Sequence, residues 1–377
     1  MAKVLVLGSL AKMMVKFRGE LLRDLVAAGH DVYACAPQAN ESIRTELLDY
    51  GVTFHNVNLS RAGLNPFRDI VFLLRMFRIF RSIQPDLFFG YTIKPVIYGS
   101  VAARLARVSN IYSMITGLGY AFVGSTLKSK IVGFFASRLY AFSLQFNKKV
   151  FFQNENDSDL FQRKRLVNRN QIVIINGSGV DTDKYFPTPF PENLSFLLIA
   201  RLLKDKGVYE YIEAARSIKQ NFPKVVFGLV GWIDENPSAI LKEDLQSWVK
   251  EGLINFYGKL DDVRPAISNC SVYVLPSYRE GTPRSVLEAM AMGRPIITTD
   301  APGCRETVID GVNGYLVPVQ DAIELAKRME HFVRNQDLLE KMGKQSRKIA
   351  ESKYDVHKVN QAILTHLALV NDNHKEG

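Results

Sequence analysis

Cysteine is scarce in this sequence, and its three copies are far apart. Cys35, Cys270 and Cys304 have no paired spacing for a disulfide framework or a zinc site, which favours a reducing compartment. The sequence also has no run of eighteen apolar residues, so no transmembrane helix is expected. Its first residues, MAKVLVLG, predict a strand rather than a signal peptide.

The glycine-rich fingerprint of dinucleotide-binding enzymes is missing too. The first expected strand runs into Gly8 and Ser9 without the GxGxxG spacing, so dehydrogenase chemistry is not expected. Low-complexity tracts and short internal repeats are likewise absent. What is present is a chain of 377 residues, 47% of them hydrophobic, which is enough for the cores of two domains.

Positive charge is concentrated in one stretch of the chain. The net charge is +10, and residues 61–149 hold 13 basic and 2 acidic side chains, whereas residues 191–377 hold 24 and 25. Because the excess is local, it predicts a surface that faces an anionic partner. Nucleic acid is a poor candidate for that partner, since no nucleic-acid-binding motif accompanies the charge.

Short apolar runs alternate with helical patterns, which is typical of repeated βαβ units and parallel sheets. A proline-rich passage, residues 185–193, interrupts the alternation and predicts a linker. We therefore expect an α/β fold with two facing, doubly wound domains, residues 1–187 and 188–377, with ligands at the carboxyl ends of the strands. The expected strands are Lys3–Gly8, Asp31–Ala36, Thr53–Asn58, Asp86–Gly90, Asn110–Ile115, Lys149–Gln153, Ile172–Ile175, Ser195–Ala200, Val225–Val230, Ile254–Tyr257, Val272–Leu275 and Pro295–Thr299; the expected helices include Gly19–Ala28, Ile70–Ser82 and a final helix from about Asp355 to Val370.

Two glutamates eight positions apart, Glu280 and Glu288, are the most informative pattern of the second half. They flank Thr282 and Pro283, where a threonine cap and a proline at the first helical position predict the start of a helix. A helix N-terminus suits a phosphate, and carboxylates accept hydrogen bonds from paired sugar or ribose hydroxyls. The pattern indicates a nucleotide-sugar pocket, although a loop charge and a solvated helix residue are the plain alternative.

A pair of cations supports the pocket. Arg201 and Lys206 follow the first expected strand of the second domain. At the carboxyl end of that strand they could neutralise a diphosphate, the arginine as a planar fork and the lysine as a point charge. A solvated loop is the alternative for these two residues taken alone.

These motifs, with the segments Asn176–Pro187 and Gly303–Val319, strongly resemble the retaining glycosyltransferases of family four, in the GT-B class with two Rossmann-like domains. The resemblance covers nearly the whole chain and is most specific from Ser195 to Pro318. It points to bacterial enzymes that extend sugars on undecaprenyl-diphosphate carriers in O-antigen (lipopolysaccharide), capsule or N-glycan precursor assembly. The segment Ser60–Phe67 is similar to that subgroup too.

The resemblance implies a role for each matching residue. Arg201 and Lys206 would bind the donor diphosphate and stabilise the leaving group, and Glu280 would contact hydroxyls of the transferred sugar; these three are the expected catalytic residues. Glu288 would bind the ribose, and Gly8 would lie near the reacting centre. The other donor contacts would come from Gly281, Thr282, Pro283, Arg284 and Ser285, of which the proline has no N–H to donate.

Two positions that are histidine in many members of that family are occupied differently here. Thr116 precedes Gly117 at the first, and the second reads GYTIKP, so that Thr116, Tyr91 and Lys94 are alternative replacements. The six histidines of the chain lie outside both segments. The residues expected to bind the acceptor are Arg18, Arg61, Asn65, Lys94 and Thr116.

Two D-x-D triplets, residues 157–159 and 181–183, could suggest a divalent metal that bridges a diphosphate. The first is expected to open a helix, with an aspartate as its cap, and the second lies in the segment that resembles the metal-free family. Neither a metal nor another cofactor is therefore expected, and the UDP-sugar is a substrate.

Two helical stretches could contact a membrane. Arg68, Arg75, Arg78 and Arg81 fall within an arc of about 140° on a helical wheel, and Leu127–Lys149 is apolar on nearly all sides with basic ends. Such helices can insert at an interface with their charges on anionic headgroups, whereas an inner helix with solvated arginines is the alternative. The expected contacts are Arg75, Arg78, Arg81, Lys128 and Lys130.

The sequence thus predicts a peripheral enzyme on the cytoplasmic face of the inner membrane. It would move a hexose or N-acetylhexosamine (GalNAc, GlcNAc, galactose or glucose) from a UDP-sugar to a polyprenyl-diphosphate-linked saccharide, with retention, in bacterial surface polysaccharide or glycan assembly. Two other functions stay open: a nucleotide-sugar epimerase of the same fold, and a non-catalytic scaffold of a polysaccharide complex.

Overall fold

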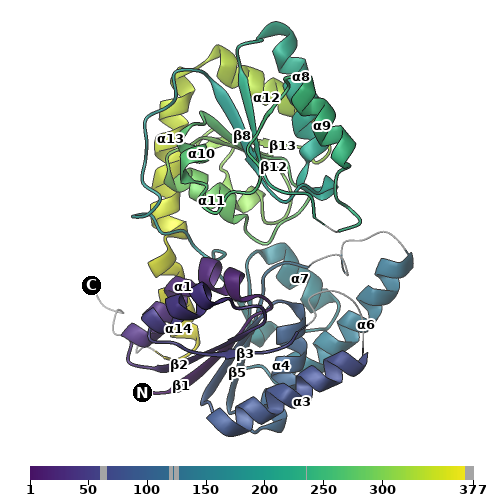
Figure 1. The fold of residues 1–377 in the computed structure, drawn as a ribbon, viewed down its shortest axis with the longest axis vertical. Coiled ribbons are helices and arrows are strands. Elements are labelled where there is room, and N and C mark those ends of the chain that lie inside the picture. The colour runs from purple at the N-terminus through teal and green to yellow at the C-terminus, as the bar shows by residue number, and fades with distance from the viewer. Residues whose placement is uncertain (60–65, 119–121, 123–126, 235, 370–377) are drawn as a thin grey trace. The chain divides into compact units, whose positions relative to one another are not determined.

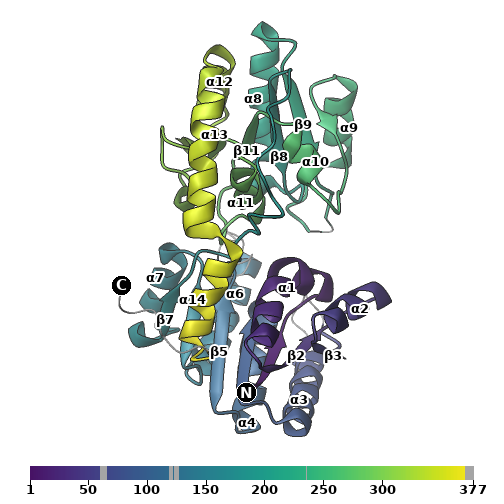
Figure 2. The same cartoon turned by 90° about the vertical axis from the view of Figure 1, so that its left-hand side faces the viewer.

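The chain forms two compact units in a computed structural model that describes residues 1–59, 66–118, 122, 127–234 and 236–369 (Figures 1 and 2). Unit 1 comprises residues 1–178 and 357–377, and unit 2 comprises residues 179–356. The boundary predicted at residue 187 therefore lies inside unit 2. The final helix, expected in the second domain, belongs to unit 1.

Unit 1 is built on a parallel sheet of seven strands in the order β3-β2-β1-β4-β5-β6-β7. Residues of β1 alternate between its faces: Val4 and Val6 join one buried cluster, and Leu5 and Leu7 join another. A strand that is covered on both faces must be apolar throughout, which explains the short apolar runs of the sequence. The strands are β1 (Lys3–Leu7), β2 (Asp31–Ala36), β3 (Thr53–Asn56), β4 (Leu87–Tyr91), β5 (Asn110–Ile115), β6 (Lys149–Phe152) and β7 (Ile172–Ile174).

Helices cover both faces of this sheet. Three helices cover the face of the sheet on which Val4 and Val6 lie: α1 (Ala11–Ala27), α2 (Glu41–Asp49) and the final helix α14 (Val356–His366). Figure 2 shows α14 against the unit 1 sheet. The helices of the other face are α3 (Pro66–Ile83), α4 (Ile93–Leu105), α6 (Leu127–Leu144) and α7 (Glu155–Arg163), and the short 3-10 turn η1 (Arg169–Gln171) precedes β7.

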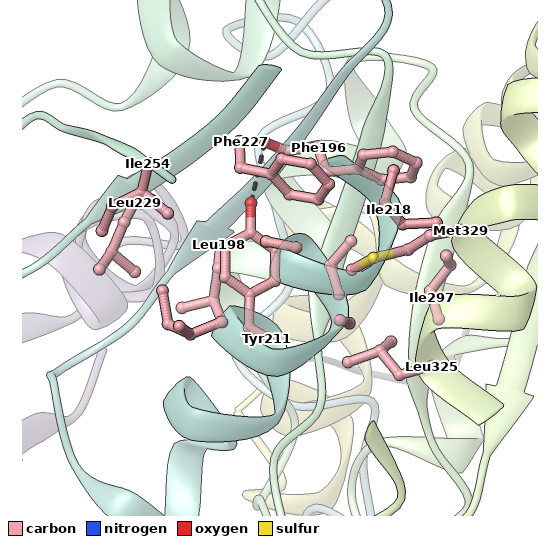
Figure 3. Packing of buried hydrophobic residues seen from close by; sticks show 14 of the residues in the cluster. Phe196, Leu198, Tyr211, Ile218, Phe227, Leu229, Ile254, Ile297, Leu325 and Met329 are labelled. Carbon is pink, nitrogen blue, oxygen red and sulfur yellow. Dashed lines mark hydrogen bonds between the residues drawn. The ribbon is translucent and has the colours of Figure 1, made fainter. Parts of the chain in front are cut away.

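Unit 2 repeats this architecture with six parallel strands in the order β10-β9-β8-β11-β12-β13. Its larger core, drawn in Figure 3, fills the space under Phe196 and Phe227, and the hydroxyl of the buried Tyr211 donates to Phe196 O at 3.0 Å. The strands are β8 (Ser195–Ile199), β9 (Val226–Val230), β10 (Asn255–Phe256), β11 (Val272–Leu275), β12 (Ile296–Thr299) and β13 (Gly314–Val317).

The helices of unit 2 likewise form two layers, one on each side of the sheet. The layer over Phe196 consists of α8 (Val208–Asn221), α9 (Lys242–Lys250), α12 (Ala322–Arg334) and the first half of α13 (Asp337–Ile349). The other layer consists of α10 (Arg264–Ser268), α11 (Arg284–Ala291) and the π-helical turn η4 (Ala350–Tyr354), and the 3-10 turns are η2 (Lys204–Lys206) and η3 (Arg305–Thr307).

Every predicted strand is present within a residue or two of its predicted ends, and the two-unit α/β fold is confirmed. Strand β13 was not among the predicted strands, and α1 begins at Ala11 instead of Gly19. The proline-rich passage 185–193 is not the linker between the units, because it lies within unit 2. There Arg294, a fully buried side chain of unit 2, donates from Nη2 to Pro189 O at 3.1 Å.

Candidate functional site

The strand order of unit 2 reverses direction between β8 and β11, which are neighbours in the sheet. In doubly wound sheets, ligands bind outside the carboxyl ends of the strands at such a switch point. The loop after β8 carries Arg201 and Lys206, and the loop after β11 carries Ser277 and Glu280. The topology thus brings the predicted cations and the first predicted glutamate to one edge of the sheet.

Lys206 and Glu280 form an ion pair at this edge. Lys206 Nζ lies 2.5 Å from Glu280 Oε1, and the two side chains are only 14% and 17% exposed. Ser277 Oγ lies 2.9 Å from the same carboxylate oxygen. A carboxylate so shielded from water needs compensation, and here a cation and a hydroxyl provide it.

Two glycines allow the loops of the site to approach each other. Gly207, at φ 70°, directly follows Lys206, and a Cβ there would lie 2.1 Å from Pro276 O. Gly303, at φ 84°, faces the Glu280 loop, where a Cβ would lie 2.2 Å from Glu280 O. Any larger residue at either position would push a loop outward, so both glycines help to place the ion pair.

Helix α11 begins beside the ion pair. Pro283 takes the N-cap position, with extended φ −73° and ψ 107°, and Thr282 precedes it, so the predicted threonine cap is wrong by one residue. Val286 N donates to Pro283 O at 3.0 Å, and Ser285 Oγ donates to Ile199 O at 3.3 Å, which ties the helix start to the end of β8. A helix N-terminus carries a partial positive charge and points backbone N–H groups outward, so this end of α11 suits an anion.

The second glutamate lies deeper in the same helix. Glu288 is buried at 2% exposure, and its Oε1 accepts from Tyr185 Oη at 3.1 Å and from Arg284 Nε at 3.2 Å. Burial and the Glu288 charge raise the pKa of Tyr185, so the phenol keeps its proton as a donor. The two predicted glutamates thus lie at different depths of one unit, one at the sheet edge and one within α11.

Arg201 is the most open of the expected donor residues. Its side chain is 45% exposed, and Nη1 pairs with Asp234 Oδ2 at 3.0 Å in the loop after β9. A partner of this kind occupies a guanidinium that was expected to hold a diphosphate. Because the guanidinium has five N–H donors, an anionic ligand at Arg201 could share it with the Asp234 carboxylate or displace that carboxylate.

In unit 1, the strand order reverses between β1 and β4, and Gly8 directly follows β1. A Cβ on Gly8 would lie 2.2 Å from Tyr91 Oη, so any larger residue there would require the Tyr91 ring to move. The guanidinium of Arg18, a buried residue of α1, lies 5.8 Å from the centre of the Tyr91 ring. The structure therefore groups Gly8 and Arg18 with Tyr91, one of the three alternatives at the histidine positions.

Within the described residues, the structure does not bring Lys94 and Thr116, which were also expected to bind the acceptor, into the group of Gly8, Arg18 and Tyr91. Lys94 Nζ forms a 2.7 Å ion pair with the buried Asp69, so the charge of the lysine is neutralised within unit 1. The second oxygen of Asp69 accepts a hydrogen bond from Tyr98 Oη at 3.0 Å. Thr116 is half-buried in the loop after β5. Arg61 and Asn65 lie outside the described residues.

The predicted membrane contacts lie on two helices of unit 1. Arg78 and Arg81 are exposed on α3, and Arg75 is half-buried there. Lys128 and Lys130 belong to α6, but their side chains lie outside the part of the chain that the structure describes. Within the described ranges, no helix is long and apolar enough to cross a bilayer.

Both D-x-D triplets have local structural partners. Asn154, not an aspartate, caps α7 by accepting from Asp157 N at 2.9 Å. Asp181 Oδ1 accepts from the backbone N–H groups of Asp183 and Lys184 and so forms a turn. Among the described residues, no group of three or more histidine, cysteine or acidic side chains is arranged to hold a metal ion.

Three residues of the site were not predicted from the sequence: Tyr185, Asp234 and Ser277. Tyr185 contacts Glu288, which lies 103 residues later in the sequence, and no local sequence pattern predicts such a contact. Ser277 could have been predicted, because it comes two residues after the end of β11 and so lies at the carboxyl edge of the sheet.

Comparisons with known proteins agree with this geometry. Residues 181–349 match the family of glycosyl transferases group 1, and residues 3–154 match the glycosyl transferase 4-like family. The N,N'-diacetylbacillosaminyl-diphospho-undecaprenol alpha-1,3-N-acetylgalactosaminyltransferase of Campylobacter jejuni is 30% identical over 362 residues, which cover 92% of this chain and 93% of that protein.

A second curated relative and a solved structure extend the comparison. The UDP-Gal:alpha-D-GlcNAc-diphosphoundecaprenol alpha-1,3-galactosyltransferase of Escherichia coli is 25% identical, over 74% of each chain. The crystal structure of Anabaena HepE in complex with UDP-glucose superposes with a TM-score of 0.79 at 20% identity and covers 98% of this chain and 100% of its own. The fold is thus that of the GT-B glycosyltransferases, and the chain belongs to the glycosyl transferases group 1: it is a glycosyltransferase.

Proposed function

We propose that this glycosyltransferase moves a hexose or N-acetylhexosamine from a UDP-sugar to a saccharide linked to a polyprenyl diphosphate, with retention of the α configuration. The observation that carries the proposal is the Lys206–Glu280 pair beside the start of α11, with Glu288 in the same helix. Such a site offers a cation and helix N–H groups for a diphosphate, and carboxylates for sugar and ribose hydroxyls. It does not call for a metal, and we propose that transfer is metal-independent.

The residues would divide the work as follows. Lys206, Arg201 and the backbone N–H groups between Gly281 and Ser285, apart from Pro283, would bind the diphosphate and stabilise the charge that develops as it leaves. Glu280 would hold hydroxyls of the transferred sugar, and Glu288 would hold the ribose. The acceptor hydroxyl would attack the anomeric carbon from the face that the diphosphate leaves, and a phosphate oxygen would take its proton.

The acceptor class and the setting rest on the relatives. The Campylobacter jejuni and Escherichia coli proteins carry names that specify diphospho-undecaprenol-linked sugars, and a further relative, from Staphylococcus aureus, is named a capsular polysaccharide biosynthesis glycosyltransferase at 25% identity. We therefore place this enzyme in the assembly of a bacterial surface polysaccharide or a lipid-linked glycan.

The test is a panel of UDP-sugars assayed against one undecaprenyl-diphosphate-linked saccharide. Release of UDP that requires the acceptor, with an α linkage in the product by NMR and no loss on addition of EDTA, is the expected result. An isomerised sugar without UDP release would indicate a nucleotide-sugar epimerase. No reaction with any donor would favour a non-catalytic scaffold of a polysaccharide complex. A β-linked product would refute retention.

We further propose that unit 1 contacts the membrane through apolar side chains of α3 and α6. On α3, Phe67, Ile70, Val71 and Leu74 are spaced as one helical stripe, and all are about half or more exposed. Exposed Arg78 and Arg81 continue that stripe towards the end of the helix. On α6, a second stripe consists of Ile131, Phe134, Phe135 and Phe142.

These stripes fit the interface of a bilayer better than water. Clusters of exposed large apolar residues are uncommon on monomeric proteins, and a polyprenyl-linked acceptor would itself lie in the membrane. On α6, the Arg138 guanidinium lies 5.3 Å from the centre of the Phe134 ring, so the stripe combines an aromatic side chain with a cation. Aromatic side chains that insert and arginines that meet anionic headgroups are the usual elements of peripheral binding.

Flotation with vesicles tests the membrane contact. The parent should float with anionic vesicles, and Arg78→Ser/Arg81→Ser and Phe67→Ser/Phe134→Ser should each reduce the floated fraction. Lys224→Ser/Lys250→Ser, which removes two exposed cations from unit 2, is the matched control and should float like the parent. Equal flotation of all four proteins would show that α3 and α6 carry ordinary solvated side chains.

A further inference from the structure

We propose that the Tyr185 hydroxyl is a positioning group for Glu288, holding one carboxylate oxygen so that the other is presented to the ribose hydroxyls of the donor. This inference rests on the proposed function, in which Glu288 binds the ribose. It assigns a task to Tyr185, a residue that precedes the first strand of the unit 2 sheet and lies outside the glutamate motif.

The hydrogen bonds of Glu288 divide unevenly between its two oxygens. Tyr185 Oη lies 3.1 Å and Arg284 Nε 3.2 Å from the same atom, Oε1. Within the described residues, Oε2 accepts no side-chain or backbone hydrogen bond. A carboxylate held at one oxygen by two donors keeps the lone pairs of its other oxygen for a ligand.

The position of the hydroxyl is itself well determined. The Tyr185 ring belongs to the buried cluster of α11, together with Val286 and Leu287. Its backbone is fixed at both ends, since Tyr185 N donates to Asp181 O at 3.0 Å and Arg347 Nη1 donates to Tyr185 O at 2.8 Å. A tyrosine has only two side-chain torsions, so a ring and a backbone fixed in this way leave the hydroxyl little freedom.

Arg284 alone would hold the carboxylate less well. Its Nε approaches Glu288 from one turn earlier on the same helix, and the arginine side chain is long and 16% exposed. The tyrosine approaches from a different segment, so the two donors together restrict rotation of the carboxylate about its terminal torsion, which is intrinsically soft. Loss of the hydroxyl would leave Glu288 present and charged but less well oriented.

Tyr185→Phe removes the hydroxyl and keeps the ring, which makes it the informative substitution. Because hydrogen bonds to charged groups are worth about 1.5 kcal/mol or more, we expect UDP to bind about tenfold more weakly. The loss should appear in the KM for the donor rather than in kcat, since the ribose contact is the same in the ground state and the transition state.

Calorimetry on the full chain with UDP and with 2′,3′-dideoxy-UDP separates positioning from packing. The parent should prefer UDP, and Glu288→Gln should lose that preference. Tyr185→Phe should weaken UDP binding and leave dideoxy-UDP binding unchanged. Tyr211→Phe is the matched control, because it removes another buried tyrosine hydroxyl of unit 2, one that donates to the backbone of the core, and it should bind both ligands like the parent.

The outcomes that overturn the proposal differ from one another. If Tyr185→Phe binds UDP like the parent while Glu288→Gln does not, the hydroxyl has no positioning role and the ribose role of Glu288 stands. Equal weakening of both ligands in Tyr185→Phe would reveal a merely structural tyrosine. If Glu288→Gln keeps the parent's preference for UDP, the ribose assignment fails, and the positioning of Glu288 fails with it.

Discussion

Replacement of Lys206 by methionine should change both the stability and the kcat of the enzyme, and the structure gives a separate estimate for each. Lys206 Nζ lies 2.5 Å from Glu280 Oε1, and with exposures of 14% and 17% the pair is mostly shielded from water. Lys206→Met keeps the length of the side chain and removes its charge. Glu280 then retains Ser277 Oγ, at 2.9 Å, as a neutral neighbour.

Two magnitudes follow from this geometry. Loss of the cation from a largely buried pair weakens the stabilisation of the Glu280 carboxylate, and we expect unfolding to become easier by about 2 kcal/mol, reduced from the fully buried case by the remaining exposure. In a unit of this size, that corresponds to a fall in Tm of about 4–8 °C. Loss of a cation that stabilises the departing diphosphate should lower kcat by about 10²–10³-fold.

The assay is UDP release at saturating donor and acceptor, with thermal unfolding measured on the same samples. Lys204→Met is the matched control, because Lys204 is an exposed lysine of the same 3-10 turn, and it should change neither quantity. In the double variant Lys206→Met/Glu280→Gln, stability should partly return, since the shielded negative charge beside the lost cation is removed, whereas activity should stay low. A Lys206→Met enzyme with the kcat of the parent would refute the catalytic role of the lysine, whatever its Tm.

Three further predictions concern the surroundings of the site and the buried groups. Gly303→Ala places a Cβ 2.2 Å from a carbonyl oxygen at φ 84°, so it should lower both Tm and transfer rate in the same assay, and an unchanged rate would contradict the close packing of the two loops. Arg294→Leu removes a fully buried guanidinium that donates to the carbonyls of Ile267, Pro189 and Ser268, and it should ease unfolding by about 2–4 kcal/mol in urea; a shift below about 1 kcal/mol would contradict a stabilising role. Burial raises the pKa of Cys35, Cys270 and Cys304 to about 12 from an ordinary value of 9.0, so their contribution to stability is complete below pH 9 and is lost as the pH rises towards 12. Urea midpoints should therefore fall across that range, and midpoints that rise would contradict the burial of the thiols.

The inner sheet strands, such as β1, β4 and β11, were predictable because they are buried on both faces and must be apolar. The edge strands β3 and β10 are more exposed, and only their short length and position between turns marked them. The start of α1 was not predictable, since its N-cap is Leu10, which makes no capping hydrogen bond. Buried contacts of Ala11 and Met14, rather than a local signal, extend that helix back to β1. Tertiary packing of this kind outweighs local helix propensity, and the residues next to the helix start give no pattern from which it can be predicted.

The boundary between the units could not be predicted from local sequence either. The proline-rich passage 185–193 has the composition of a linker, yet the buried Arg294 and the half-buried Arg347 donate to its carbonyls and hold it to unit 2. The actual crossings of the chain are at residues 178–179 and 356–357. A backbone pairing of Val180 with Asp355 lies beside both crossings, and composition does not reveal this contact between distant parts of the chain.

At the candidate site, the residues that define the chemistry were predictable and their supports were not. Glu280 and Lys206 follow the strands at which the sheet order reverses, so the topology alone brings them together. The donors that orient Glu288 come from Tyr185, 103 positions away, and from Arg284 in the preceding turn of the same helix. Only the folded chain shows how the two converge on one oxygen.

A crystal structure of the enzyme with UDP, grown without divalent metal, tests the central claim most directly. We predict the diphosphate at the start of α11 within hydrogen-bond distance of Lys206, and the ribose hydroxyls on Glu288. UDP bound elsewhere on the molecule, or bound with neither side chain in contact, would contradict the assignment of this site to the nucleotide-sugar donor.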